Sequence, residues 1–106
     1  MEITGNELRE KIKNGETMII DFYATWCGPC KAMAPSFEQL AKTKNVDDSP
    51  IRLYKYDVES DRDLTLELGI TGVPTIKGYK IGEEVYSKTG MMMSYELTKV
   101  IDEILK

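Results

Sequence analysis

The two cysteines, Cys27 and Cys30, are the residues of this sequence best suited to covalent chemistry. Their spacing places both sulfurs on one face of a helix, one turn apart. Only a thiolate attacks a disulfide, and a helix N-terminus at Cys27 would favour that charged form. Cys30 lies one turn deeper and is expected to be the less exposed of the two. The pattern therefore predicts a dithiol redox pair in which Cys27 attacks and Cys30 resolves the mixed disulfide.

Three other interpretations of this pair remain open. The cysteines could form a structural disulfide, although closing so short a ring stabilises a protein by only about 2 kcal/mol. They could supply half of a metal site that a second chain completes, or they could be inert reduced thiols. The position of the pair, between a predicted strand and a predicted helix, favours redox chemistry.

The composition excludes several other kinds of chemistry. The sequence has no histidine, so it holds no Ser-His-Asp triad, no Cys-His pair and no imidazole metal ligand. Two cysteines are too few for a secreted disulfide framework or a four-ligand zinc site, and no metal is expected. Eighteen acidic against fourteen basic residues give a net charge of −4, which argues against binding to nucleic acid or an anionic membrane. Without an apolar span or a signal-peptide pattern, the expected location is the cytoplasm.

The elements that must position the cysteines follow from the hydrophobic pattern. Thr4 and Glu7 form a capping box for a first helix, which Gly15 ends. Residues 17–24 form a nearly continuous apolar run, typical of a strand buried on both faces, with Asp21 in its middle. Residues 29–44 follow a helical pattern, and Pro35 inside it is expected to kink the helix.

The second half of the sequence continues the alternation. Residues 51–58 are a second predicted strand, and Ser60 is the expected cap of a short helix. Residues 75–80 and 84–89 form a predicted hairpin, and a last amphipathic helix follows Ser94, its expected N-cap. The length of 106 residues fits one domain over residues 1–106. The predicted class is α/β, with a central mixed sheet of parallel strands and a terminal antiparallel hairpin, flanked by helices on both faces.

The segment from Asp21 to Lys31, DFYATWCGPCK, closely resembles the active site of the thioredoxin family. The resemblance extends over nearly the whole chain. It includes Ala34-Pro35, the segment from Gly69 to Thr75 and Gly90. These features together are far more specific than two cysteines at this spacing.

The resemblance implies the thioredoxin fold and a protein-disulfide reductase. A flavin-containing reductase that uses NADPH would recharge the protein, which would bind no cofactor itself and act as a monomer on disulfide-containing client proteins. A Gly-Pro pair between the cysteines, here Gly28-Pro29, goes with the reducing members of the family. The resemblance also gives Trp26, Gly28 and Pro29 a part in tuning the redox pair.

The same resemblance assigns roles outside the cysteine motif. Asp21 would act beneath Cys30 and help it lose its proton, because burial raises the pKa of a carboxyl group. The Val73-Pro74 bond would be cis and lie opposite the cysteines, exposing the Val73 backbone for strand-like pairing with an extended substrate. The substrate surface is then expected to consist of Trp26, Gly72, Val73, Pro74, Gly90 and Met91.

Several residues depart from the family pattern. Leu53 stands where many relatives have a lysine near the buried aspartate, and Lys55 is expected to face away. Lys77-Gly78 interrupts an otherwise apolar strand and is expected to weaken the sheet locally. Met91-Met92-Met93 beside the site fits either adaptable substrate contact or ordinary packing.

Three functions are compatible with these features. The leading one is a general dithiol reductant. The second is a dedicated electron donor to one reductase or peroxidase. The third, from another class, is a binding subunit that uses the fold as a clamp on a larger enzyme while its thiols are incidental.

Overall fold

Four strands form one mixed sheet in the spatial order β2-β1-β3-β4, in a computed structural model that describes residues 1–106. The strands are β1 (Met18–Tyr23), β2 (Arg52–Asp57), β3 (Thr75–Lys80) and β4 (Glu83–Thr89). The β1–β2 pair is parallel, and β1–β3 and β3–β4 are antiparallel. The predicted architecture is therefore confirmed, and β1 lies inside the sheet with a partner on each side.

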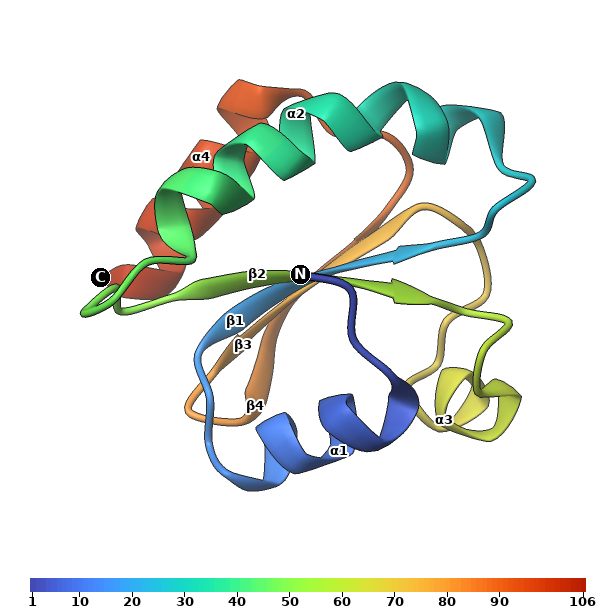
Figure 1. The fold of residues 1–106 in the computed structure, drawn as a ribbon, viewed down its shortest axis with the longest axis horizontal. Coiled ribbons are helices and arrows are strands. Elements are labelled where there is room, and N and C mark those ends of the chain that lie inside the picture. Colours follow the sequence, from blue (N-terminus) through green and yellow to red (C-terminus); the bar gives the residue numbers. More distant parts are fainter.

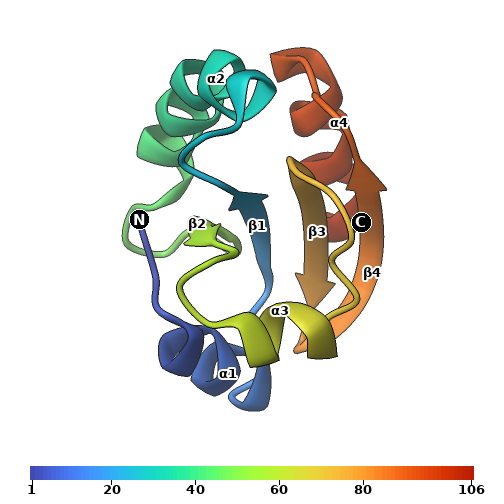
Figure 2. The same cartoon turned by 90° about the vertical axis from the view of Figure 1, so that its right-hand side faces the viewer.

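The helices cover both faces of this sheet. They are α1 (Gly5–Lys13), α2 (Gly28–Lys44), α3 (Arg62–Glu67) and α4 (Ser94–Leu105). Figure 1 shows α2 and α4 on one face and α1 and α3 on the other, and the view in Figure 2 agrees. None of the helices is both long enough and apolar enough to cross a membrane.

Each face of the sheet has its own buried core. The core under α2 and α4 includes Ile19, Phe37, Leu53, Ile76 and Ile101. The core under α1 and α3 includes Leu8, Ile20, Phe22, Tyr56 and Tyr79. Successive residues of β1 thus enter opposite cores, as the period of two along a strand requires. This explains why the strand is apolar throughout, apart from Asp21.

The predicted ends of α1 are confirmed. The Glu7 backbone N–H donates to the Thr4 hydroxyl at 3.1 Å, and the Glu7 carboxylate accepts from the Thr4 N–H at 2.9 Å. After the helix, Gly15 has a φ of 73°, in the left-handed region that favours glycine.

The two other predicted caps are wrong by one residue. Asp61, and not Ser60, caps α3, because its carboxylate accepts from the Leu64 N–H while the Ser60 hydroxyl donates to the Asp57 carbonyl. Met93 is the N-cap of α4, and Ser94 is already helical. The Glu96 carboxylate accepts from the Met93 N–H at 3.0 Å, which is the part of a capping box that the third helical residue supplies. The helix α2 continues through Pro35 as one element.

The strand β3 accommodates the polar break at Lys77-Gly78. The Lys77 side chain is buried, and its ammonium pairs with the Glu84 carboxylate at 2.6 Å. A side chain at Gly78 would collide with the Ile104 methyl group of α4 and lie 3.3 Å from the Tyr86 Cβ. The missing side chain therefore lets α4 pack close to the sheet, and pairing continues past it with a bulge at Gly78/Tyr79.

This close contact predicts that Gly78→Ala destabilises the protein. The added methyl group overlaps Ile104, and overpacking of this kind typically costs about 1–3 kcal/mol. Urea unfolding measures the change. Gly28→Ala is the matched control, since nothing lies within contact of a side chain at that position. Equal stability of the two variants would show that α4 is not held at this distance.

Candidate active site

The cysteine pair lies where β1 gives way to α2. Cys27 is the N-cap of α2, and its backbone N–H donates to the Ala24 carbonyl at 3.2 Å. The two cysteines are joined as a disulfide with their Cα atoms 5.2 Å apart. The Cys30 backbone N–H donates to the Cys27 sulfur at 3.2 Å. Of the two sulfurs, that of Cys27 thus receives a free N–H of the helix terminus, where negative charge is favoured.

The expected difference in exposure between the cysteines is wrong. Cys27 is 3% exposed and Cys30 is 4% exposed in the disulfide form. Both belong to one small buried cluster with Ala24, and Val73 packs against it. A bond across a single helical turn draws both sulfurs into the same environment. The chemical asymmetry of the pair therefore rests on the N-cap hydrogen bond and not on solvent access.

The segments around the cysteines expose an apolar surface. Trp26 is 67% exposed and Met91 is 47% exposed, which is high for side chains of this size. Gly28 and Pro29 are also exposed, whereas Gly72, Val73 and Gly90 are half-buried and Pro74 is buried. Of the three consecutive methionines, Met92 is buried in the core under α2 and α4, so packing accounts for that one.

The loop before β3 leaves one residue without backbone partners. The Val73-Pro74 bond is cis, as the resemblance implied. The Pro74 carbonyl accepts from the Gly90 N–H at 2.8 Å, and the Gly72 carbonyl accepts from the Thr75 hydroxyl at 2.6 Å. Between them, the N–H and C=O of Val73 make no hydrogen bond. These free groups lie in a residue that packs against the cysteine cluster.

Asp21 is a buried carboxylate without a hydrogen-bond partner. Its side chain is fully buried on the α2 side of the sheet, and neither carboxylate oxygen has a donor. Loss of hydration disfavours the charged form and raises the pKa of Asp21 to about 7. The Lys55 ammonium opposes this rise, and the Glu2 and Glu38 carboxylates add to it. Asp21 can therefore exchange a proton near neutral pH.

The expectation that Lys55 faces away from Asp21 is wrong. Lys55 is the partner of Asp21 across the β1–β2 pair, whereas Leu53 is the partner of Ile19. Leu53 and Ile19 share the core under α2 and α4, so the alternation along the strands places Lys55 and Asp21 on that face too. Sequence reasoning gave Lys55 the wrong orientation and missed its neighbours Glu2, Tyr23 and Glu38, because the strand register decides which of these residues meet.

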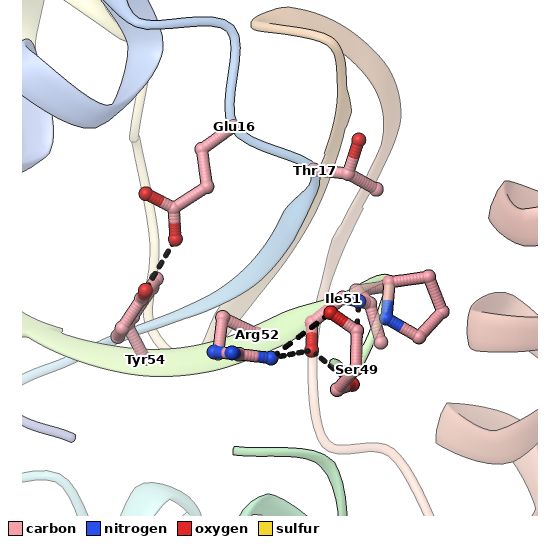
Figure 3. Close-up of a pocket in the computed structure, with 7 residues that line it drawn as sticks. Glu16, Thr17, Ser49, Ile51, Arg52 and Tyr54 are labelled. Atoms are coloured by element: carbon pink, nitrogen blue, oxygen red, sulfur yellow. Dashed lines mark hydrogen bonds between the residues drawn. The ribbon is translucent and has the colours of Figure 1, made fainter. Parts of the chain in front are cut away.

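A separate surface hollow of about 460 Å³ lies at the opposite end of the sheet (Figure 3). Thr17, which lies just before β1, and Arg52, the first residue of β2, both border this hollow. The cysteines follow the other end of β1. Its polar groups bond to one another: Tyr54 donates to Glu16, and the Arg52 guanidinium donates to the Ser49 and Ile51 carbonyls. The first bond joins the segment before β1 to β2, and the Arg52 bonds stay within the segment that enters β2, so none of them involves the redox pair. No group of three or more cysteine, aspartate or glutamate side chains is placed to hold a metal ion.

Comparison with known proteins decides the family. The family model described as Thioredoxin matches residues 1–103. The chain belongs to the thioredoxin family. The structure of Plasmodium falciparum thioredoxin has a TM-score of 0.83 and 34% identity, with 96% of each chain covered.

Curated relatives include proteins of two kinds. The protein disulfide-isomerase A4 of Bos taurus is 36% identical over 89% of this chain but only 13% of its own length. A "Probable thioredoxin-2" of Caenorhabditis elegans is 32% identical over 89% of this chain and 63% of its own length. The chain thus spans a small part of the isomerase and less than two thirds of the second relative. This thioredoxin-family chain holds its two cysteines paired as a disulfide at the start of α2.

The raised pKa of Asp21 predicts a specific pH dependence of stability. Folding favours the protonated acid, because its pKa is about 7 in the folded protein and near 3.8 in the unfolded chain. The stability that this group contributes is fully present below the unfolded pKa and is lost as the pH rises from there through about 7. Asp21→Asn removes this loss, so the variant should be more stable than the wild type at pH 8, by about 1–3 kcal/mol if the amide finds a partner.

Urea unfolding of both proteins from pH 4 to pH 8 measures this effect. The difference in unfolding free energy should be small at pH 4 and grow with pH. Asp102→Asn is the control, because it removes an exposed carboxylate from α4. A pH-independent difference for Asp21→Asn, or a loss of stability at pH 8, would contradict the burial argument.

Proposed function

We propose that this protein is a protein-disulfide reductase of the thioredoxin type, in which Cys27 attacks and Cys30 resolves. The observation that carries this proposal is the hydrogen bond from the Cys30 N–H to the Cys27 sulfur at the N-terminus of α2. In the reduced protein the same donor would stabilise a thiolate on Cys27 more than on Cys30. The attacking sulfur is the one whose negative charge the helix favours.

The reaction follows as two exchanges. The Cys27 thiolate bonds to one sulfur of the client disulfide, and the other client sulfur leaves as a thiolate that takes up a proton. Cys30 then loses its proton and attacks the Cys27 sulfur, which releases the second client sulfur and forms the Cys27–Cys30 disulfide. Two electrons pass to the client. Asp21 is proposed to accept the Cys30 proton, because it is an unpaired buried acid with a pKa near 7.

The client is proposed to bind as an extended segment beside the cysteines. The free N–H and C=O of Val73 provide one strand-like pair of hydrogen bonds. Trp26, Gly72, Pro74, Gly90 and Met91 would supply the apolar contacts around it, which suits brief contact with many sequences. Gly28 and Pro29 between the cysteines support a reducing member of the family, and so does the absence of histidine from the chain.

The wider setting belongs to the same proposal. A flavin reductase would carry electrons from NADPH to the Cys27–Cys30 disulfide, so the protein would serve as an electron carrier without a cofactor of its own. It would act as a monomer, through one domain over residues 1–106, in the cytoplasm. The net charge of −4 supports clients other than nucleic acid or an anionic membrane.

Similarity to disulfide isomerases supports a second candidate activity, the rearrangement of client disulfides. The two activities differ in the fate of the mixed disulfide. A reductase completes the exchange through Cys30, whereas an isomerase returns the client sulfur to another client cysteine. Insulin reduction with NADPH and a thioredoxin reductase, run beside reactivation of scrambled ribonuclease, separates them. Turnover in the first assay with weak activity in the second is expected, and the reverse would assign the isomerase role.

The two cysteines should behave differently when replaced. Cys30→Ser is predicted to accumulate stable mixed disulfides with clients, because attack remains while resolution is lost. Cys27→Ser should trap far less and abolish insulin reduction. Non-reducing gels and mass spectrometry of the trapped sulfur measure the difference. Trapping by Cys27→Ser would reverse the assignment, and a wild type that fails to reduce insulin would favour a binding subunit with incidental thiols.

A further inference from the structure

The Lys55 ammonium is the one positive charge that acts on Asp21, but it forms its ion pair with Glu38. Lys55 and Asp21 are partners across adjacent parallel strands, which lie about 4.8 Å apart, so the lysine side chain is long enough to reach the carboxylate. Lys55 nevertheless makes no ion pair with Asp21. Its ammonium is 3.1 Å from the Glu38 carboxylate of α2 and 4.5 Å from the centre of the Tyr23 ring. The half-exposed Glu38 thus binds the Lys55 ammonium, and the buried Asp21 carboxylate has no cation paired with it.

Tyr23 and Glu2 complete this arrangement. The Tyr23 hydroxyl donates to the Glu2 carboxylate at 2.7 Å, which fixes the ring over which the Lys55 ammonium sits. The Ile3 N–H bonds to the Lys55 carbonyl, so the N-terminal segment lies along the edge of β2. Of the three carboxylates in this region, those of Asp21, Glu2 and Glu38, only that of Glu38 pairs with the Lys55 ammonium.

We infer that Glu38 is a positioning residue, whose carboxylate holds the Lys55 ammonium over the Tyr23 ring and thereby leaves the Asp21 carboxylate unpaired. The charged groups that act on Asp21 are Lys55 from β2, Glu38 from α2 and Glu2 from the N-terminal segment. The strand β3 places apolar Ile76 opposite Asp21. The cysteines at the start of α2 are the thiols whose protons Asp21 would exchange. The inference concerns the electrostatics of Asp21, and its catalytic consequence rests on the proposed function.

Glu38→Gln tests the inference, because it removes the ion pair and keeps the size of the side chain. The freed ammonium should move toward Asp21, and an opposite charge at close range lowers a carboxyl pKa by about 1–3 units. Carbon-13 NMR titration of the Asp21 carboxyl group in the oxidised protein measures the shift without any client or reductase. Backbone amide spectra confirm that each variant is folded.

Glu2→Gln is the matched control for charge alone. Glu2 also raises the pKa of Asp21, and its effect ranks before that of Glu38, but it makes no ion pair with Lys55. If glutamate charge acted only through space, Glu2→Gln would lower the Asp21 pKa at least as much as Glu38→Gln. The inference requires the larger fall with Glu38→Gln, and that fall must shrink by more than half in a Lys55→Met background. Any other pattern overturns it.

A kinetic measurement separates this inference from the proposed function. The pH profile of single-turnover disulfide reduction by the reduced protein should have a limb that moves to lower pH in Glu38→Gln, in step with the NMR value for Asp21. If the NMR pKa falls as expected while the pH profile stays fixed, Glu38 positions Lys55 but Asp21 is not the proton acceptor. If the NMR pKa does not fall, Glu38 does not have this role, whatever the rate.

Discussion

The burial of β1 on both faces is the constraint on which the redox site depends. The strand has a neighbour on each side and a helix layer above and below, so every side chain from Met18 to Phe22 is fully buried. Such a strand is rigid, and the chain that leaves it enters α2 at a fixed place. The N-terminal turn of α2 then aims its free N–H groups at Cys27. The same burial removes water from Asp21, so one strand both positions Cys27 and raises the pKa of the Asp21 carboxyl group.

Charge around this strand is arranged so that the acid stays neutral more readily than a surface carboxyl group would. An ammonium placed directly against Asp21 would lower its pKa and weaken it as a base. The structure instead places that cation between an α2 carboxylate and an aromatic ring, both on the same face of the sheet. Desolvation therefore prevails, although a lysine lies on the neighbouring strand. The outcome depends on which carboxylate the lysine contacts, and the number of charges alone does not decide it.

The sequence predicted those features that local chemistry determines. The capping box of Thr4 and Glu7, the buried run before the cysteines and the hairpin around Ile81-Gly82 all depend on residues close in the chain. The caps of α3 and α4 were misplaced because neighbouring residues competed for one role. Asp61 caps α3 in place of Ser60, and α4 begins at Ser94 itself, with Met93 as its N-cap and Glu96 bonded to the Met93 N–H.

Features that depend on strand register or on packing between elements were not predictable in this way. A shift of one residue in β2 would turn Lys55 to the other face of the sheet. Its placement beside Asp21 could therefore be known only from the register of the paired strands. The packing of Ile104 against Gly78 likewise brings together α4 and β3, which are distant in the sequence. The near-equal burial of Cys27 and Cys30 also depends on such packing, here by Ala24 and Val73, which a helix pattern alone does not reveal.

Stability and chemistry make opposite demands on Asp21. An apolar side chain of similar size, or an amide with a hydrogen-bond partner, would avoid the free energy needed to desolvate a carboxylate at this position. The retained acid therefore lowers stability at neutral pH, in the strand to which the active-site helix is attached. Neither oxygen makes a hydrogen bond that could offset this cost. Under the proposed function, the physical advantage of such a group lies in its proton exchange near pH 7, when Cys30 must lose a proton in order to resolve. A fully solvated carboxylate would be stable but too weak a base at that pH, and one tightly paired with Lys55 would be weaker still.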